Sequence, residues 1–421
     1  MKILVIGSGG REHALSWQCA KFDNIEQVFV APGNAGTELE SKITNIDIGS
    51  DDIEGLVVFA KENEIDLTIV GPEGPLVAGV VDRFKGKGLA IFGPTMAASQ
   101  LEGSKSFCKD FLSRNNIPTA HYGVFTDSLE ATKYVQDKGT PIVIKADGLA
   151  AGKGVIIATT EIEAIDAIND MLEGNRFGDA GSRVVIEEFL EGEEASFIVM
   201  VDGKNILPMA TSQDHKARDN GDTGPNTGGM GAYSPAPIVS DKIFQQVIEE
   251  IIKPTVESMA DEGNTYSGFL YAGLMIDSNG NSKVLEYNCR FGDPETQPIM
   301  MRLKSNLADL CILATEGRLD EADIEWDSRV SLGVVLAAKG YPDSYTKGET
   351  ISLPSESDDC KVFHAGTIIE GGNVVSSGGR VLCATALGES TKKAQNCAYS
   401  LVEKIGWQGA YYRNDIGFKA L

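Results

Sequence analysis

Short, uninterrupted apolar runs separated by amphipathic stretches fill the first hundred residues, and this alternation is what most restricts the fold. The expected strands lie at residues 3–6, 27–30 and 67–70, and the expected helices at 12–21 and 53–62. Strands without polar alternation are buried on both faces, as in a parallel sheet covered by helices. We therefore expect a doubly wound α/β domain over residues 1–103.

Glycine-rich turns follow the three expected strands, at residues 7–11, 31–36 and 71–73. Ligands of such sheets bind at the carboxyl ends of the strands. The first turn invites a dinucleotide interpretation, but Glu12 stands where the third glycine of that fingerprint belongs. A glycine loop ending in Arg11 at a helix start suits a single phosphate, since backbone amides and the helix dipole favour anions there. A plain strand-to-helix turn remains the alternative.

A strand expected at residues 284–290 carries polar groups on one face. Its period of two puts Glu286, Asn288 and Arg290 on that face, and the core face receives Leu285, Tyr287 and Cys289. Carboxylate and amide oxygens suit Mg²⁺, which takes one or two protein ligands beside waters and substrate phosphates. A guanidinium can hold an anion by two parallel hydrogen bonds. Pro294 and Glu295 then predict a helix start. A solvated strand face is the alternative.

Residues 145–154 form a glycine-rich loop between expected strands at 141–145 and 155–158. The loop differs from a Walker A sequence in its spacing, and a strand follows where a helix should. Such a loop can fold as a flap over phosphates, with Lys145 and Lys153 supplying charge. A simple β-hairpin turn would look the same.

Two further segments carry candidate binding groups. After the strand that begins at Val184, Glu187 to Leu190 could meet an adenine, and Glu194 could accept hydrogen bonds from ribose hydroxyls, although an acidic surface loop is the alternative. Residues 211–235 read as a long glycine-rich loop without structure of its own, which is usually functional or disordered. Residues from about 327 onward predict a smaller α+β unit.

The composition restricts partners and location. With 37 basic and 61 acidic residues the net charge is −24, which repels nucleic acids and anionic membranes. The seven cysteines form no CxxC pair and no zinc spacing, so we expect reduced thiols and a cytoplasmic protein. No signal peptide opens the chain, and no apolar run approaches the ~18 residues of a membrane helix.

The flap 145–154, the segment 187–190 and the strand 284–288 together resemble an ATP-grasp enzyme. With residues 7–12, 31–36, 212–216, 222–235 and 290–298, the whole chain closely resembles the phosphoribosylamine–glycine ligase family of purine biosynthesis. The resemblance implies an N-terminal doubly wound domain, 1–103, an ATP-grasp domain, 104–326, with a flap subdomain of about 122–188 inserted, and a small C-terminal domain, 327–421. It also implies a mono-functional enzyme and a monomer.

The reaction implied by this resemblance joins glycine to 5-phosphoribosylamine with MgATP or MnATP, through glycyl phosphate. No protein nucleophile is required, so catalysis is positioning and charge neutralisation. The resemblance assigns catalytic roles to Lys145, Asp214 and Arg290, and the metal to Glu286 and Asn288. It assigns ATP to Lys105, Lys145, Gly152, Lys153, Gly154, Glu187, Glu188, Phe189, Leu190 and Glu194. It assigns the other substrates to Gly9, Gly10, Arg11, Glu12, Gly33, Asn34, Asp214, Gly228, Gly229, Arg290, Asp293, Pro294, Glu295 and Thr296.

Three rival functions stay open on the sequence alone. A nicotinamide oxidoreductase would rest on residues 7–10, and Glu12 counts against it. A catalytically inactive nucleotide-binding regulator would bind ATP without glycine-dependent ADP release. Another ATP-grasp ligase, such as a carboxylase, would release phosphate with a different substrate.

Overall fold

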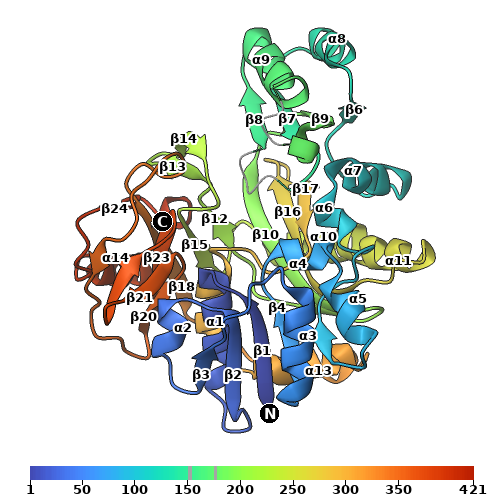
Figure 1. Ribbon diagram of the computed structural model, residues 1–421. Helices are drawn as coiled ribbons and strands as arrows, with labels where there is room; N and C mark the ends of the chain where they lie inside the picture. The colour runs from blue at the N-terminus through green and yellow to red at the C-terminus, as the bar shows by residue number, and fades with distance from the viewer. Residues whose placement is uncertain (150–153, 175–177) are drawn as a thin grey trace.

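The computed structural model describes residues 1–149, 154–174 and 178–421. Figure 1 shows several α/β bodies. The N-terminal sheet and its helices lie at the bottom, a small helix-covered sheet stands at the top, and the C-terminal part packs at the left.

The N-terminal body is a parallel five-stranded sheet of order β3-β2-β1-β4-β5. Its strands are β1 (Lys2–Gly7), β2 (Gln27–Pro32), β3 (Ile43–Asn45), β4 (Leu67–Val70) and β5 (Ile91–Phe92). Its helices are α1 (Gly10–Ala20), α2 (Ala35–Leu39), α3 (Ile53–Glu62), α4 (Glu73–Val77) and α5 (Val80–Lys85). Leu4 and Ile6 of β1 face the core of α3 and α5, whereas Ile3 and Val5 face α1. Burial on both faces confirms the doubly wound sheet that the apolar runs predicted.

The body at the top of Figure 1 is an antiparallel sheet of order β6-β9-β7-β8. It contains β6 (Tyr122–Phe125), α8 (Ser128–Lys138), β7 (Ile142–Ala146), β8 (Val155–Ala158), α9 (Glu161–Leu172), η1 (Gly178–Gly181) and β9 (Val184–Glu188). Ala131, Val135, Ile144 and Ile168 belong to a small core of its own, separate from the cores of the other bodies. We call this body the flap sheet.

Beneath the flap sheet lies an antiparallel sheet of order β11-β10-β16-β17. Its strands are β10 (Glu193–Asp202), β11 (Ile206–Pro208), β16 (Ser267–Ile276) and β17 (Ser282–Asn288). The helices around it are α6 (Gln100–Gly103), α7 (Lys105–Arg114), α10 (Asp241–Val247), η2 (Ile248–Ile252), α11 (Lys253–Asp261), α12 (Thr296–Arg302), α13 (Leu307–Thr315) and η3 (Leu319–Glu321). Apolar side chains of β10 and β16 pack with those of the N-terminal sheet, so the two sheets share cores.

The C-terminal body is built on a sheet of order β12-β15-β18-β23-β20, with β24 beside β18. Its elements are β18 (Val330–Ala338), β19 (Thr350–Ile351), β20 (Cys360–His364), β21 (Thr367–Glu370), β22 (Asn373–Ser376), β23 (Arg380–Gly388), α14 (Thr391–Val402), β24 (Ala410–Tyr411) and η4 (Phe418–Ala420). This mixture of strands and helices confirms the α+β unit that the sequence predicted from about residue 327 onward.

Residues 211–235 differ from the prediction of a loop without structure. They contain β12 (Gln213–Asp214), β13 (Ala217–Asp219), β14 (Thr223–Asn226) and β15 (Gly231–Ser234). β15 pairs antiparallel with β18, and Gly231 lies opposite Val334. The segment is ordered by a sheet more than a hundred residues away along the chain, so its own short and glycine-rich sequence does not reveal the strands.

Candidate active site

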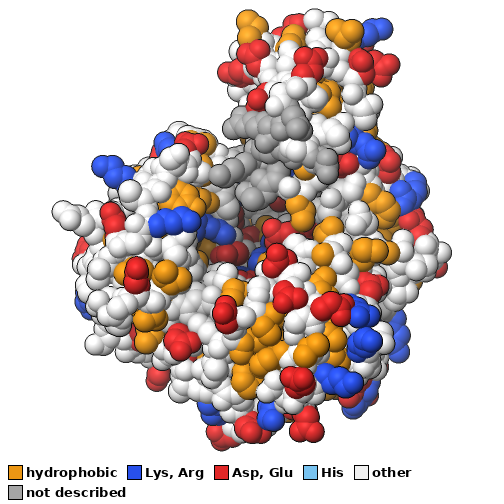
Figure 2. Space-filling model, viewed as in Figure 1, with side chains coloured by type: hydrophobic (Ala, Val, Ile, Leu, Met, Phe, Trp, Pro, Cys, Tyr) orange, Lys and Arg blue, Asp and Glu red, His pale blue; other side chains and the backbone are white. Residues whose placement is uncertain are grey.

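A cavity of about 770 Å³ opens between the flap sheet, the β10–β17 sheet and the C-terminal body. Figure 2 shows acidic and basic side chains close together in the hollow at the centre of this face. The cavity wall brings together many of the sequence-predicted site residues, which are Arg11, Lys105, Lys145, Gly154, Glu187, Glu188, Phe189, Leu190, Glu194, Asp214, Gly228, Glu286, Asn288, Arg290, Asp293 and Glu295. Gly152 and Lys153 lie outside the described residues.

Glu286 and Asn288 lie at the C-terminal end of β17, and both line the cavity. Burial raises the pKa of Glu286, but the charges of Lys216, Lys145 and Lys105 outweigh it and lower the pKa to about 2. An ionised carboxylate and an amide oxygen, two residues apart on one strand face, are oxygen ligands that fit a hard divalent cation.

The predicted alternation of this strand is wrong at Leu285, which faces the cavity and not the core. The pairing of β16 with β17 shifts register there, because Gly273 lies opposite Glu286 while Leu274 lies opposite Val284. This bulge turns Leu285 to the cavity wall, whereas Cys289 is buried as predicted and Tyr287 is 2% exposed although it also borders the cavity.

Lys145 and Lys109 share one buried carboxylate at the roof of the cavity. Their ammonium groups lie 2.9 and 2.8 Å from the Glu187 oxygens. Lys145 also donates to the carbonyl oxygen of Leu285, and Lys109 donates to the hydroxyl of Thr119 at 2.8 Å. The carboxylate of Glu187 is thus held by cations, and the predicted adenine contact of residues 187–190, which involves their backbone, stays a prediction.

Lys105 opens α7 and donates to the carbonyl oxygen of Gly148 at 3.0 Å. Burial lowers its pKa. Beyond Glu187 the chain leaves the flap sheet through Glu188, Phe189 and Leu190, which line the cavity beside Glu194 at the start of β10. An apolar pair next to exposed backbone is the arrangement that a flat base and its edge require.

Arg290 lies two residues beyond the end of β17. Its Nη2 is 2.8 Å from Glu102 and its Nε is 3.4 Å from Glu73. Burial alone lowers the pKa of Arg290, but these two carboxylates outweigh it and raise the pKa. The predicted strand is too long at this end, since β17 stops before Arg290, but Arg290 lines the same cavity as Glu286 and Asn288, and the N-terminal carboxylates orient its guanidinium.

Asp214, at the end of β12, is half-buried in the cavity wall near Lys216 and Arg380. Burial and the nearby Glu295 carboxylate raise the pKa of Asp214. Its Oδ1 is buried without a hydrogen-bond partner among the described residues. A carboxylate with a buried, uncommitted oxygen is suited to hold an ammonium or accept a proton.

The glycine loop after β1 is held by protein contacts. The Glu12 carboxylate accepts hydrogen bonds from the Gly9 amide at 2.5 Å and from Arg11 Nε at 2.6 Å. Glu12 fills the space beside Gly7 and Gly71, where a Cβ would collide with its side chain. A carboxylate in this position occupies the amides that a dinucleotide pyrophosphate would need, which is why the glycine fingerprint departs at Glu12.

Asn34 has a structural use that the sequence did not suggest. Its Oδ1 accepts from the Gly36 and Thr37 amides, and its Nδ2 donates to the carbonyl oxygens of Ser8 and His364. All of these contacts cap α2 and fasten the glycine loop to the C-terminal body. The cavity lining does not include several predicted substrate residues, which are Gly10, Glu12, Gly33, Asn34, Gly229, Pro294 and Thr296.

A smaller cavity of about 240 Å³ adjoins the first and shares Asp293, Tyr341 and Arg380 with it. Gly9 lines this smaller cavity. Arg380 lies 3.0 Å from Asp293 and donates to the carbonyl oxygens of Gly228 and Asp293. Its guanidinium therefore joins the turn after β17 to the loop before β15.

Sequence reasoning missed several cavity residues, which are Glu73, Glu102, Lys109, Lys216, Tyr341 and Arg380. Lys216 stands two residues from Asp214, and its neighbourhood in the unusual 211–235 segment was a usable signal. Arg380 and Tyr341 lie in the C-terminal body, where no local motif marks them. No helix in the described part of the chain is long and apolar enough to cross a membrane.

Comparisons with known proteins place this geometry in a family. Three family models, described as the N, ATP-grasp (A) and C domains of phosphoribosylglycinamide synthetase, match residues 1–102, 103–296 and 331–419. The phosphoribosylamine–glycine ligase of Vibrio parahaemolyticus is 64% identical over 423 residues, covering 100% of this chain and 99% of that protein. The enzyme of the same name from Salmonella typhimurium is also 64% identical, over 424 residues and with the same coverage.

Solved structures agree with the family models. The crystal structure of phosphoribosylamine–glycine ligase from Thermotoga maritima has a TM-score of 0.86 and 34% identity, and the match covers 99% of this chain and 100% of that one. A biotin carboxylase domain from Hydrogenobacter thermophilus, at 17% identity and a TM-score of 0.75 over 98% of this chain and 91% of that one, shares the fold. The chain therefore belongs to the phosphoribosylamine–glycine ligase family and has the ATP-grasp fold.

Proposed function

We propose that this chain joins glycine to 5-phosphoribosylamine and converts ATP to ADP and phosphate, giving glycinamide ribonucleotide for purine biosynthesis. The observation that carries the proposal is the cavity of about 770 Å³. Its wall combines lysine ammonium groups, two oxygen ligands suited to a divalent cation, and an apolar slot for a flat base. The 64% identity over the full chain supports the choice of substrates.

In this proposal the flap sheet and the β10–β17 sheet hold ATP between them. Lys105 and Lys145 meet its phosphates, Glu187 to Leu190 border the adenine, and Glu194 accepts from the ribose. Glu286 and Asn288 supply oxygen ligands to Mg²⁺ or Mn²⁺, and the ion's other ligands are phosphate oxygens and waters. When bound, the ion neutralises charge on the transferring phosphoryl group.

Glycine and phosphoribosylamine occupy the side of the cavity nearer the N- and C-terminal bodies. The glycine carboxylate attacks the γ-phosphate, whose bond to the bridging oxygen breaks, and this gives glycyl phosphate and ADP. The amine then attacks the carbonyl carbon of glycyl phosphate, loses a proton and expels phosphate. Arg11, Arg290 and Asp293 border this region, and Asp214 offers a buried oxygen to the amine. The protein positions the reactants and neutralises charge, and no side chain forms a bond to them.

The domain division proposed is 1–103, 104–326 with the flap at about 122–188, and 327–421. We also propose a monomer that works in the cytoplasm and does not bind nucleic acid. Seven free cysteines suit a reducing compartment, and a net charge of −24 repels a phosphate backbone.

One assay tests the function. ADP release is measured with MgATP, glycine and freshly generated phosphoribosylamine, and each component is omitted in turn. We expect ADP only when all three are present. Release that depends on bicarbonate and ignores glycine would assign the chain to another ATP-grasp reaction, and ATP binding without release would make it a regulator.

A further inference from the structure

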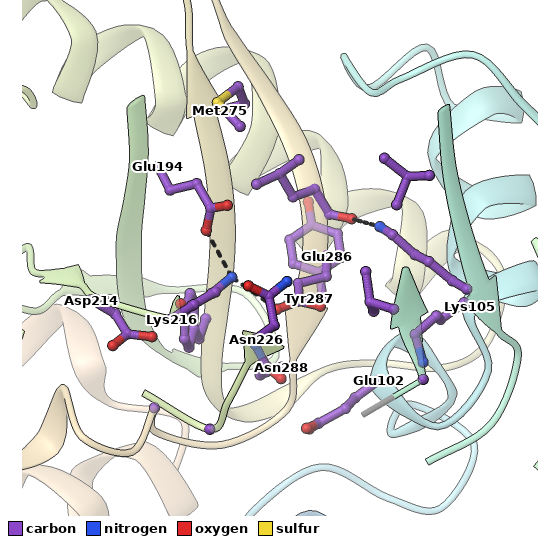
Figure 3. A pocket seen from close by; sticks show the side chains of 18 of the residues that line it. Glu102, Lys105, Glu194, Asp214, Lys216, Asn226, Met275, Glu286, Tyr287 and Asn288 are labelled. Atoms are coloured by element: carbon purple, nitrogen blue, oxygen red, sulfur yellow. Dashed lines mark hydrogen bonds and ion pairs between the residues drawn. The ribbon is translucent and has the colours of Figure 1, made fainter. Parts of the chain in front are cut away.

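Lys216 lies between two carboxylates that the proposed function uses for different parts of MgATP. Its Nζ is 2.8 Å from Glu194 Oε2 and 3.6 Å from Glu286 Oε1. Figure 3 shows the Lys216 ammonium reaching into the cavity beside these two side chains. Glu194 begins β10 and Glu286 belongs to β17, so one cation connects two strands that are separated by β16.

The backbone fixes where this ammonium can go. The carbonyl oxygen of Lys216 accepts hydrogen bonds from the amide and hydroxyl of Thr227, at 2.8 and 2.9 Å. The residues on either side are also paired, since His215 exchanges backbone hydrogen bonds with Met230 and Gly231. The side chain therefore starts from a rigid position and points across the sheet.

The sheet leaves room for the ammonium. Tyr271, Gly273 and Met275 alternate on the cavity face of β16, and Tyr271 and Met275 line the cavity. Gly273 lies directly opposite Glu286, and a Cβ there would come within 3.3 Å of the Glu286 side chain. Because Gly273 has no side chain, nothing on β16 separates Lys216 from Glu286.

We propose that Lys216 is a positioning residue that serves as an internal counter-ion of Glu286 and competes with a divalent cation for that carboxylate. The inference rests on the proposed function, in which the phosphates of MgATP give Lys216 another anion to contact. A metal ion that arrives alone must displace the ammonium from Glu286. A metal ion that arrives on the nucleotide brings its own replacement partner for Lys216.

Electrostatics supports this competition. Two like charges a few ångströms apart repel each other, so the Lys216 ammonium near Glu286 opposes the arrival of a second cation. About a third of each side chain of the Lys216–Glu286 pair is exposed, so solvent weakens the effect without removing it. The consequence is an enzyme that binds its metal weakly until a nucleotide is present.

The test measures metal binding rather than turnover. Mn²⁺ is titrated into the full chain without nucleotide, and free Mn²⁺ is followed by electron paramagnetic resonance. Lys216→Met, which keeps the apolar stem, should bind Mn²⁺ at least tenfold more tightly than the parent chain. Lys216→Gln should show the same direction and provides a second variant if the first folds poorly.

Lys105→Met is the matched control, because it also removes one positive charge from the cavity. The ammonium of Lys105 donates to the carbonyl oxygen of Gly148, whereas that of Lys216 lies within ion-pair distance of Glu286. The charge of Lys105 also lowers the pKa of Glu286, but less than the charge of Lys216 does, so this variant should raise Mn²⁺ affinity by less than threefold. Adding Glu286→Gln to Lys216→Met should abolish the gain, since the gained affinity belongs to that carboxylate.

Equal gains in the Lys216 and Lys105 variants would overturn the inference, because the effect would then be the general field of the cavity. No gain in either Lys216 variant would also overturn it, and the substrate-omission assay on the parent chain would still stand on its own. Conversely, a parent chain without glycine-dependent ADP release would refute the proposed function, and the manganese titrations would still decide the role of Lys216.

Discussion

Replacing Glu187 with Gln should loosen the flap sheet far more than replacing its neighbour Lys109 with Met. Glu187 is 2% exposed and lies within 2.9 Å of two ammonium groups, from Lys109 and Lys145. The Gln side chain keeps the size and one acceptor but removes the negative charge. Two buried cations then lack a counter-ion, and breaking a buried pair in this way costs about 3–5 kcal/mol.

Lys109→Met leaves the Lys145–Glu187 pair intact. The hydroxyl of Thr119 loses one donor but still donates to the carbonyl oxygen of Val284 at 2.7 Å. The variant loses the hydrogen bond to Thr119 and the ion pair with Glu187, which Lys145 still neutralises, so the cost should be about 2 kcal/mol.

Amide hydrogen exchange in β7 and β9 is the suitable assay, because a chain of 421 residues with several cores does not unfold in one step. Exchange should quicken by roughly 10² to several 10³ in Glu187→Gln and by about thirtyfold in Lys109→Met, since each ~1.4 kcal/mol is a factor of ten. Similar exchange rates in the two variants would refute the claim that one carboxylate neutralises both lysines.

Three further outcomes are expected. Lys145→Met should weaken ADP binding in calorimetry by roughly ten- to hundredfold, the worth of a charge-assisted hydrogen bond, and an unchanged affinity would remove Lys145 from the phosphate site. Arg290→Lys retains charge but cannot bridge two carboxylates, so the Michaelis constant for glycine or phosphoribosylamine should rise about tenfold while ADP affinity stays; the reverse pattern would place Arg290 in the nucleotide site. Burial lowers the pKa of His364 from 6.5 to about 3, so the unfolded chain binds the proton better and stability is lost as pH falls through this window. His364→Gln should reduce the pH dependence of the amide protection factors in β20 between about pH 6.5 and 3, and an unaltered profile would contradict that assignment.

Local pattern was enough to predict the parts of the molecule whose burial is simple. α3 and β4 begin and end where the apolar periodicity placed them, because both faces of the N-terminal sheet are covered and each strand is a continuous apolar run. The sequence also placed Glu286 and Asn288 on one face correctly, because side chains two residues apart in a strand point to the same side. The orientation of Leu285 was predicted wrongly because it depends on a bulge. A bulge is determined by the pairing with the partner strand β16, which the sequence of β17 alone does not reveal.

Long-range contacts explain what the sequence concealed. Arg380 reaches the site from β23. It contacts Asp293, which lies 87 positions earlier in the chain, and Gly228, which lies 152 positions earlier. Asn34 was predicted to touch substrate, yet its amide is consumed by backbone groups of α2, the glycine loop and β20. Whether a polar side chain serves a ligand or the fold depends on which backbone groups tertiary packing brings beside it, and no spacing rule carries that information.

The cations of the cavity show how an acidic chain can hold a polyphosphate. Lys216, Lys145, Arg290 and Arg380 each lie within ion-pair distance of at least one carboxylate, so most of the positive charge facing the cavity is already neutralised. Phosphates that enter must exchange places with these carboxylates, and the exchange couples ligand binding to the contacts between the bodies. Lys105 differs, because among the described residues its ammonium donates to a carbonyl oxygen, a neutral partner. It can meet a phosphate without first leaving an anion, and it is therefore the lysine that we expect to contact the nucleotide first.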